Sequence, residues 1–431
     1  MKNYNVLVLL LFLIISCNND NDEICDDNSY NGSLELTTQQ EIDEFINNCY
    51  QTINGDLVIR GEITNLNGLQ NITSVNGLLE IVNTSLVNLE GLQNMNFANG
   101  ISIVDNNNLM NLKGLEVSTT AFISIIGNSN LTSIDDLRNI SSVGSLTIEG
   151  NDSLIDLNGL EAITSVDDLN VSYNNSLENI SSLQNIISVE NSLFIRENNS
   201  LSNIDGLSSV TSIGSTLRID SNNSLINLNG LESLNLVGSL LILDNNSLMD
   251  LNGLNNLTST SHIMISANLN LVSIEGLQNV TSPIIDDLLI LNNESLLNLN
   301  GLNNIPSVGR NLDIKFNINL TNIDGLQSIT SVGNSLEVNG NYNNLINLDG
   351  LQNITSVGRD LIIERNEVLT NLDGLQNIIS LGSYMKIDSN IVLTNLCGIE
   401  SIINNFSGQI DIQNNGFNPS PQEIIDGNCS Q

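Results

Sequence analysis

The feature that most constrains the fold is a repeat of about 24 residues that runs through most of the chain. In the copy at residues 311–334, seven apolar residues recur at fixed positions: Leu312, Ile314, Leu320, Ile323, Leu326, Ile329 and Val332. The alternating Leu-x-Ile segment predicts a strand, and the wider spacing after it predicts turns. One copy alone buries too little apolar surface to be stable, so we expect the copies to stack.

From the third strand signal onwards, an asparagine lies three residues after the final Ile or Val of the strand. The series is Asn106, Asn128, Asn151, Asn174, Asn198, Asn222, Asn245, Asn268, Asn293, Asn317, Asn341, Asn366, Asn390 and Asn415. An asparagine amide accepts and donates, and asparagine tolerates tight turns. The series therefore predicts a buried asparagine ladder with a structural role.

The Leu-x-Ile signal occurs sixteen times between residues 57 and 412, which predicts an all-β solenoid of about sixteen turns. At each end, a capping box with apolar residues behind it predicts a short helix. The first begins at Thr38 with Glu41 three residues on, and the second begins at Ser420 with Glu423. We expect an N-terminal cap at residues 34–56, repeats at 57–412 and a C-terminal cap at 413–431.

Composition excludes one class of partner and disfavours another. The chain has 48 acidic and 11 basic residues, a formal charge of −37, which would repel a phosphate backbone. We therefore expect no nucleic-acid binding. Aromatic residues make up 3% and Trp is absent, which removes the usual stacking surface for sugars but leaves a surface glycan as an open alternative to a protein partner.

The first 16 residues have a lysine at position 2 and then an apolar run too short to span a bilayer, which predicts an export signal. The run ends at Ser16-Cys17 and resembles the lipobox of bacterial lipoproteins, which implies lipidation of Cys17 and a membrane anchor. The residues after it, Asn18 to Glu23, are similar to the acidic export tag of surface lipoproteins of the Bacteroidota. The resemblance implies a lipid-anchored protein on the outer membrane that faces the cell exterior.

Two alternatives remain open. A secreted protein with a spare thiol would share the export signal. The acidic run after Cys17 is also typical of a solvated tether, which we expect over residues 17–33, and either interpretation places the domain outside the cytoplasm.

Four further cysteines, Cys25, Cys49, Cys397 and Cys429, lie near the ends of the chain, in a compartment that permits disulfides. In a rod, the first two lie at one end and the last two at the other, beyond the roughly 7 Å Cα separation that a disulfide bridges. We therefore expect Cys25–Cys49 and Cys397–Cys429.

The segment Asn54-Gly55-Asp56-Leu57-Val58-Ile59 and the later Leu-x-Ile-x-x-Asn-x-x-Leu turns resemble the receptor L-domain family. In ordinary leucine-rich repeats the next Leu comes two residues after the Asn, whereas here it comes three after, as from Asn151 to Leu154. The resemblance covers roughly residues 34–429. It implies a right-handed, leucine-rich-repeat-like β-solenoid that binds proteins or serves the cell surface without catalysis.

No catalytic constellation is present in the sequence. The single histidine, His262, has no partner motif, and the few basic residues are scattered. We expect a non-catalytic binding or adhesion scaffold without a resident cofactor. A structural envelope spacer and a β-solenoid carbohydrate-active enzyme are the alternatives.

Two sets of residues are candidate sites. The outward positions of the strands carry apolar side chains in place of polar ones in the middle of the chain, and large exposed apolar patches often mark partner sites. These residues are Phe194, Leu241, Leu243, Met264, Leu289 and Leu291. In addition, Asp324, Asp349 and Asp373 share one phase on three successive turns, and calcium prefers such oxygen ligands.

Overall fold

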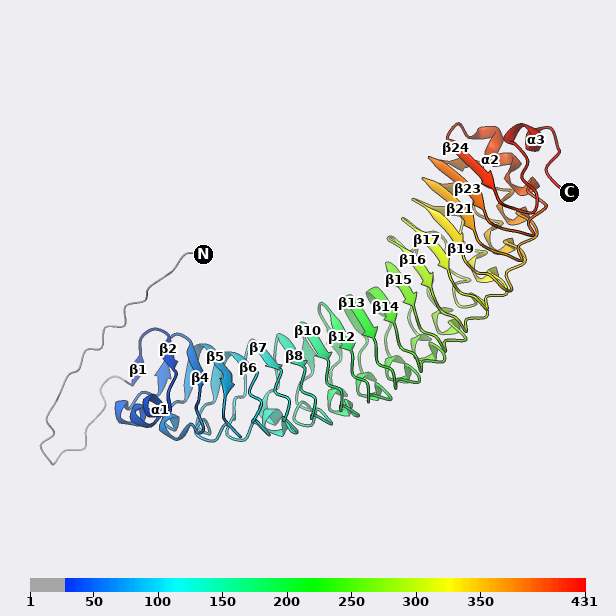
Figure 1. The fold of residues 1–431 in the computed structure, drawn as a ribbon. Helices are drawn as coiled ribbons and strands as arrows, with labels where there is room; N and C mark the ends of the chain where they lie inside the picture. Colours follow the sequence, from blue (N-terminus) through cyan, green and yellow to red (C-terminus); the bar gives the residue numbers. More distant parts are fainter. Residues whose placement is uncertain (1–27) are drawn as a thin grey trace, which may run out of the picture.

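A continuous parallel sheet lies along the concave side of a curved rod, as Figure 1 shows. The computed structural model describes residues 28–431; the predicted signal peptide, Cys17 and Cys25 lie outside them. Each turn contributes one strand, which pairs with the strands of the turns before and after it. The predicted fold class, an all-β, leucine-rich-repeat-like solenoid with short helical caps, is confirmed.

The strands of the concave sheet are β2 (Leu34–Leu36), β4 (Leu57–Gly61), β5 (Ser74–Thr84), β6 (Phe97–Val104), β7 (Phe122–Ile126), β8 (Ser145–Glu149), β10 (Asp168–Ser172), β12 (Leu193–Arg196), β13 (Ser212–Asp220), β14 (Leu236–Leu243), β15 (His262–Ser266), β16 (Leu288–Leu291), β17 (Leu312–Lys315), β19 (Leu336–Asn339), β21 (Asp360–Glu364), β23 (Tyr384–Asp388) and β24 (Gln409–Gln413). Strand β2 lies inside the range predicted as the N-terminal cap, yet it pairs with β4. The sheet therefore begins one turn earlier than the predicted start at residue 57.

A second parallel ladder precedes the concave strands in many turns and was not predicted. Its separate strands are β1 (Ser29–Tyr30), β3 (Thr52–Ile53), β9 (Ser165–Val166), β11 (Ser188–Val189), β18 (Ser331–Val332), β20 (Ser356–Val357) and β22 (Ser380–Leu381). In β5, β6, β13 and β14 one strand contributes to both ladders, with a register shift between them in the β5–β6 and β13–β14 pairs. In two-residue strands such as β18 and β20, the second residue, Val332 or Val357, is buried in the core.

Short 3₁₀ turns form the convex side. They are η2 (Asn67–Leu69), η3 (Asp135–Asn139), η4 (Ser181–Leu183), η5 (Asp205–Leu207), η6 (Asn229–Leu231), η7 (Asn252–Leu254), η8 (Glu275–Leu277), η9 (Asp324–Leu326), η10 (Asp349–Leu351), η11 (Asp373–Leu375) and η12 (Cys397–Ile399). In most of them a glycine precedes a buried Leu. At Gly253 an added Cβ would lie 1.6 Å from the carbonyl oxygen of Leu228 in the preceding turn, so at this position the two turns leave no room for a side chain.

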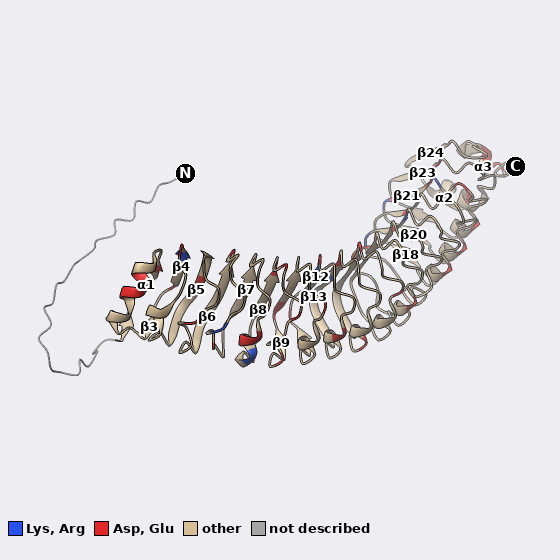
Figure 2. Ribbon diagram, turned by 60° about the horizontal axis from the view of Figure 1, so that its bottom comes forward, with Lys and Arg blue, Asp and Glu red and all other residues tan. Residues whose placement is uncertain are grey.

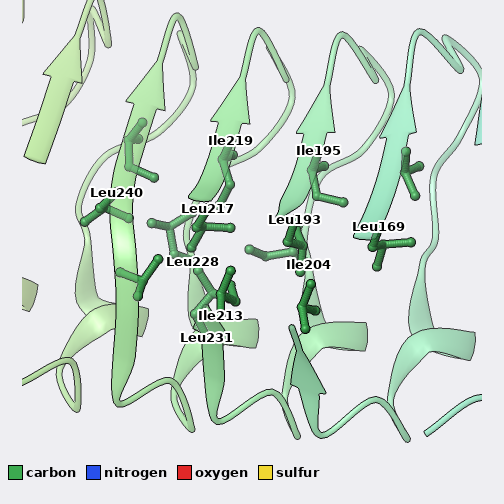
Figure 3. Packing of buried hydrophobic residues seen from close by; sticks show 14 of the residues in the cluster. Leu169, Leu193, Ile195, Ile204, Ile213, Leu217, Ile219, Leu228, Leu231 and Leu240 are labelled. Carbon is green, nitrogen blue, oxygen red and sulfur yellow. The ribbon is translucent and has the colours of Figure 1, made fainter. Parts of the chain in front are cut away.

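The core is a single column of aliphatic side chains that fills the rod (Figure 3). All seven apolar residues of the repeat at 311–334 are at most 1% exposed, as the sequence predicts. Corresponding side chains of successive turns, such as Leu193, Leu217 and Leu240, stack on one another. Because each turn buries its apolar residues against its two neighbours, stability depends on continuous stacking.

The predicted asparagine ladder is confirmed, and its geometry explains the turn after each strand. Asn106 to Asn390 are fully buried, and Asn415 at the last turn is 9% exposed. In Asn245, Oδ1 accepts the Asn222 main-chain N–H at 3.1 Å, and Nδ2 donates to the carbonyl oxygens of Ile219 and Leu243 at 2.9 and 2.8 Å. The residue before each ladder asparagine from Asn106 to Asn415 has positive φ, as at Asp244 with φ 52°.

Helical caps close both ends. The helix α1 (Gln39–Phe45), continued by η1 (Ile46–Asn48), begins with the predicted Thr38 capping box, and α3 (Pro421–Ile425) begins with the predicted Ser420 capping box. A further helix, α2 (Glu400–Asn405), packs beside α3 and was not predicted. The predicted Cys397–Cys429 disulfide is present and ties the last turn to the C-terminal tail. Cys49 is also disulfide-bonded, while Cys25 lies outside the described residues.

Candidate functional site

The outward side chains of β14, β15 and β16 form an apolar surface at the centre of the concave sheet. Parallel pairing places Leu241 beside Met264 and Met264 beside Leu289, while Leu243 and Leu291 flank Ser266 in the next row. All of these leucines and Met264 are half-buried. We call Leu241, Leu243, Met264, Leu289 and Leu291 the concave apolar patch. That they lie on adjacent strands is confirmed, and their role in binding stays a prediction.

Phe194, the sixth residue of the predicted set, is separated from the patch. The register places Phe194 beside Arg218, and Arg218 beside Leu241. Phe194 instead packs against Arg196, whose guanidinium carbon lies 5.5 Å from its ring centroid. An Arg218–Asp220 ion pair therefore lies between Phe194 and the concave apolar patch.

Charged residues border the patch on its C-terminal side. Lys315 Nζ lies 2.9 Å from Asp313 Oδ2 and 2.7 Å from Glu337 Oε2, so it links carboxylates of β17 and β19. Burial opposes the charged form of Lys315, but the hydrogen bonds that it donates to Glu337 and Asp313, together with the charges of these carboxylates, prevail and raise the pKa of its ammonium. Burial raises the pKa of Asp313, with Lys315 opposing it.

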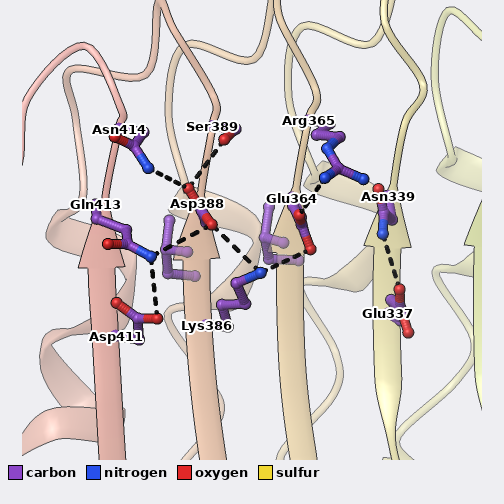
Figure 4. A network of polar contacts seen from close by, with 12 residues as sticks. Glu337, Asn339, Glu364, Arg365, Lys386, Asp388, Ser389, Asp411, Gln413 and Asn414 are labelled. Atoms are coloured by element: carbon purple, nitrogen blue, oxygen red, sulfur yellow. Dashed lines mark hydrogen bonds and ion pairs between the residues drawn. The ribbon is translucent and has the colours of Figure 1, made fainter.

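The same arrangement recurs further along the sheet (Figure 4). Lys386 Nζ lies 3.0 Å from Glu364 Oε2 and 3.3 Å from Asp388 Oδ2, and the hydrogen bond with Glu364 is the main reason its pKa is raised. Asp388 Oδ1 also accepts from Asn414 Nδ2 and Ser389 Oγ at 2.9 Å each. This end of the concave face is a saturated polar network, because its lysines are already held between carboxylates.

Lys315→Met is expected to destabilise the protein by about 1–3 kcal/mol at neutral pH, because two half-buried carboxylates would lose their cation. The pKa of Asp313, which burial already raises, would then rise further above its unfolded value, so the destabilisation is present above the folded pKa and declines as pH falls through it. Chemical denaturation at pH 7 and near pH 4 measures this, and the deficit should shrink at the lower pH. Lys113→Met is the matched control, since its pair with Glu90 is mostly exposed; a deficit of equal size in both variants would contradict the expectation.

The three candidate calcium ligands lie on the convex side. Asp324, Asp349 and Asp373 each begin a 3₁₀ turn and are exposed. Within residues 28–431, no group of three or more His, Cys, Asp or Glu side chains is placed to hold a metal ion. Calcium binding therefore stays a prediction that this geometry does not support.

The remaining charged groups are His262, beside the patch, and acidic residues spread along the rod. His262 borders the concave apolar patch on β15, and its Nδ1 lies 3.9 Å from Asp287 Oδ2. Figure 2 shows acidic residues distributed along the rod from α1 to the C-terminal turns. Among the described helices none is long and apolar enough to cross a membrane.

A second exposed apolar set was missed in the sequence. In four successive turns, the residue directly after the Leu of Asn-x-x-Leu is apolar and exposed. These residues are Ile226, Met249, Val272 and Leu297, which are 52%, 58%, 39% and 44% exposed. Main-chain hydrogen bonds link them, as from Met249 N–H to the Ile226 carbonyl. We call these four residues the lateral apolar column. The signal was an apolar residue directly after the Leu of Asn-x-x-Leu, on the flank where the chain leaves the concave sheet.

Comparison with known proteins shows no family for this chain. No family model matches the chain, and no curated protein matches it. The resemblance to the receptor L-domain family therefore stays a prediction. Among solved structures, 51 chains match. One is TLR13 in complex with ssRNA13, at 12% identity and a TM-score of 0.25, covering 85% of this chain and 67% of that chain. A TM-score this low carries no argument about function, and the fold assignment depends on the sheet and turns described above.

Proposed function

We propose that this protein is a non-catalytic binding or adhesion scaffold that captures a protein partner on its concave face. The observation that carries the proposal is the concave apolar patch. Leu241, Met264 and Leu289 occupy aligned outward positions on three neighbouring strands, where most other strands carry polar or charged side chains. Aligned apolar side chains on a rigid sheet provide a preorganised surface for a partner.

The chemistry on the concave face supports binding of a protein more than turnover of a substrate. The lysines that a catalytic cleft would use, Lys315 and Lys386, are each engaged by two carboxylates. An apolar centre with a polar rim is the usual anatomy of a protein interface. The long rod also suits a spacer, and the partner test below separates the two functions.

The concave patch is tested by the double variant Leu241→Asp and Leu289→Asp. We expect it to weaken partner binding at least about tenfold, because it places charges where apolar surface would be buried. Met249→Asp, on the lateral apolar column, is the matched control and should bind as the native protein does. The measurement is affinity for a partner captured by the native protein. Equal affinity in the double variant would exclude the patch as the binding surface, and failure of the native protein to capture any partner would leave the spacer function.

We further propose that the scaffold is anchored to the outer membrane through lipidated Cys17 and faces the cell exterior. The support is the Ser16-Cys17 lipobox resemblance and the acidic residues that follow it. Protease shaving of intact cells, with native protein and Cys17→Ala, tests this address. We expect the native form to be shaved from the surface and the variant to lose membrane attachment. Protection of the native form would instead place the rod in the periplasm.

A further inference from the structure

One cation of the concave sheet differs from the rest. Five basic residues lie in its strands: Arg60, Arg196, Arg218, Lys315 and Lys386. Four of them form ion pairs with a carboxylate on the same or a neighbouring strand. Arg196 forms no ion pair with any side chain of residues 28–431, although the protein is strongly acidic overall. Its charge is therefore available to an outside group.

The surroundings of Arg196 hold its guanidinium in place. The guanidinium carbon lies 5.5 Å from the Phe194 ring centroid and 5.9 Å from that of Tyr173, the residue directly after the neighbouring strand β10. Nε donates to Ser172 Oγ at 3.2 Å, and Ser172 is fully buried. Contacts with two rings and a bonded Nε restrict the side chain before any ligand arrives. We call Ser172, Tyr173, Phe194 and Arg196 the Arg196 cluster.

A carboxylate is the group that fits this arrangement. Arginine binds carboxylates through two parallel N–H···O bonds, and with Nε already engaged the two terminal nitrogens remain for the ligand. The adjacent Arg218 offers no equivalent site, because Asp220 already pairs with it. The net charge of −37 repels acidic groups over the surface as a whole, so within the concave sheet attraction to a carboxylate is local to the Arg196 cluster.

We propose that the Arg196 cluster and the concave apolar patch form one composite site for an extended acidic and apolar segment of a protein partner. This inference rests on the proposed function and names the chemistry of the partner. The register places Arg196 beside Asp220 and Asp220 beside Leu243. Arg196 and Leu243 therefore lie two strands apart, which corresponds to about 10 Å at the usual strand spacing. An extended peptide advances about 3.3 Å per residue, so its carboxylate should precede its first buried apolar side chain by about three residues.

A peptide-display selection tests this without knowledge of the natural partner. A library of random linear peptides is selected on the immobilised full-length protein at physiological salt, and the strongest binder is synthesised. We expect enrichment of Asp or Glu about three residues from Leu, Ile, Phe or Met. Arg196→Gln should weaken the synthetic peptide about tenfold, as expected for loss of a bidentate carboxylate contact. Arg60→Gln is the matched control, because Arg60 lies on the distant concave strand β4 and is paired with Glu35, and it should change the affinity for the peptide by less than about twofold.

The outcomes separate the inference from the proposed function. Enriched peptides that lack an acidic residue, or that bind Arg196→Gln as tightly as the native protein, would overturn the composite site while leaving the concave apolar patch as a docking surface. If no enriched peptide loses affinity on Leu241→Asp, the proposed function fails as well. Thermal melting of each variant verifies that it is folded.

Discussion

Asn245→Leu is expected to destabilise the solenoid by about 3–5 kcal/mol, although leucine nearly preserves the side-chain volume and apolar residues surround it. The substitution removes the acceptor of the Asn222 main-chain N–H and the donor to the carbonyl oxygens of Ile219 and Leu243. It also removes the acceptor at 3.4 Å from Asn222 Nδ2, which continues the ladder. Buried polar groups that lose their partners bear the full cost of desolvation.

The neighbouring Asn246 is the matched control for this prediction. It is half-buried, and its amide makes one side-chain hydrogen bond, to Asn223. Asn246→Ala should therefore change stability by less than about 1 kcal/mol. Urea denaturation followed by circular dichroism measures both variants. Because turns are stable only against their neighbours, opening at Asn245 should spread to adjacent turns and broaden the transition. Equal stability of Asn245→Leu and the native protein would show that the ladder is not structural.

Gly253→Ala is expected to be at least as damaging as many core truncations, at about 3 kcal/mol or more. The backbone of Gly253 does not have the positive φ that favours glycine, so the cost comes from space alone. An added Cβ would lie 1.6 Å from the Leu228 carbonyl oxygen and 2.2 Å from its carbon. Two successive turns would have to separate, which would break the stacking of the core below them.

Gly150→Asn is the control that isolates this effect. Gly150 has φ 69° in the turn before a ladder asparagine, and an added Cβ there would approach Gly127 no closer than 3.5 Å. Asparagine already occupies the same position at Asn292 with φ 56°, so Gly150→Asn should be nearly neutral. Comparing the melting temperatures of the two variants tests the argument. If Gly253→Ala had the melting temperature of the native protein, the two turns would have room for a methyl group, which would contradict the expectation.

The sequence predicted the interior of this protein better than its surface. Core positions such as Leu312 and Ile314 repeat in every turn, so sixteen copies reinforce one pattern. The asparagine ladder was predictable for the same reason. The second ladder, with strands such as β18, was not predicted, because a two-residue Ser-Val segment is too short for a recognisable alternation.

The concave face depends on which outward residues become neighbours, and that requires the register between turns. Leu241, Met264 and Leu289 could be aligned because each lies between the two apolar residues of its strand. The contact of Arg196 with Tyr173 could not be predicted in the same way, because Tyr173 lies beyond the end of β10. Its backbone has a positive φ of 58°, and its ring lies against the Arg196 guanidinium. The lateral apolar column had a sequence signal, but its residues lie outside the strands, and the predicted sites were taken from outward strand positions.

Site-specific photo-crosslinking on intact cells shows whether the concave face is the binding face. A photoreactive residue is placed at Met264 in the concave apolar patch, at Met249 in the lateral apolar column, or at the exposed Gln278 on the convex side. We expect a discrete protein adduct at position 264 that is abolished by Leu241→Asp with Leu289→Asp, and little or none at 249 and 278. An adduct at 249 or 278 with none at 264 would contradict this expectation.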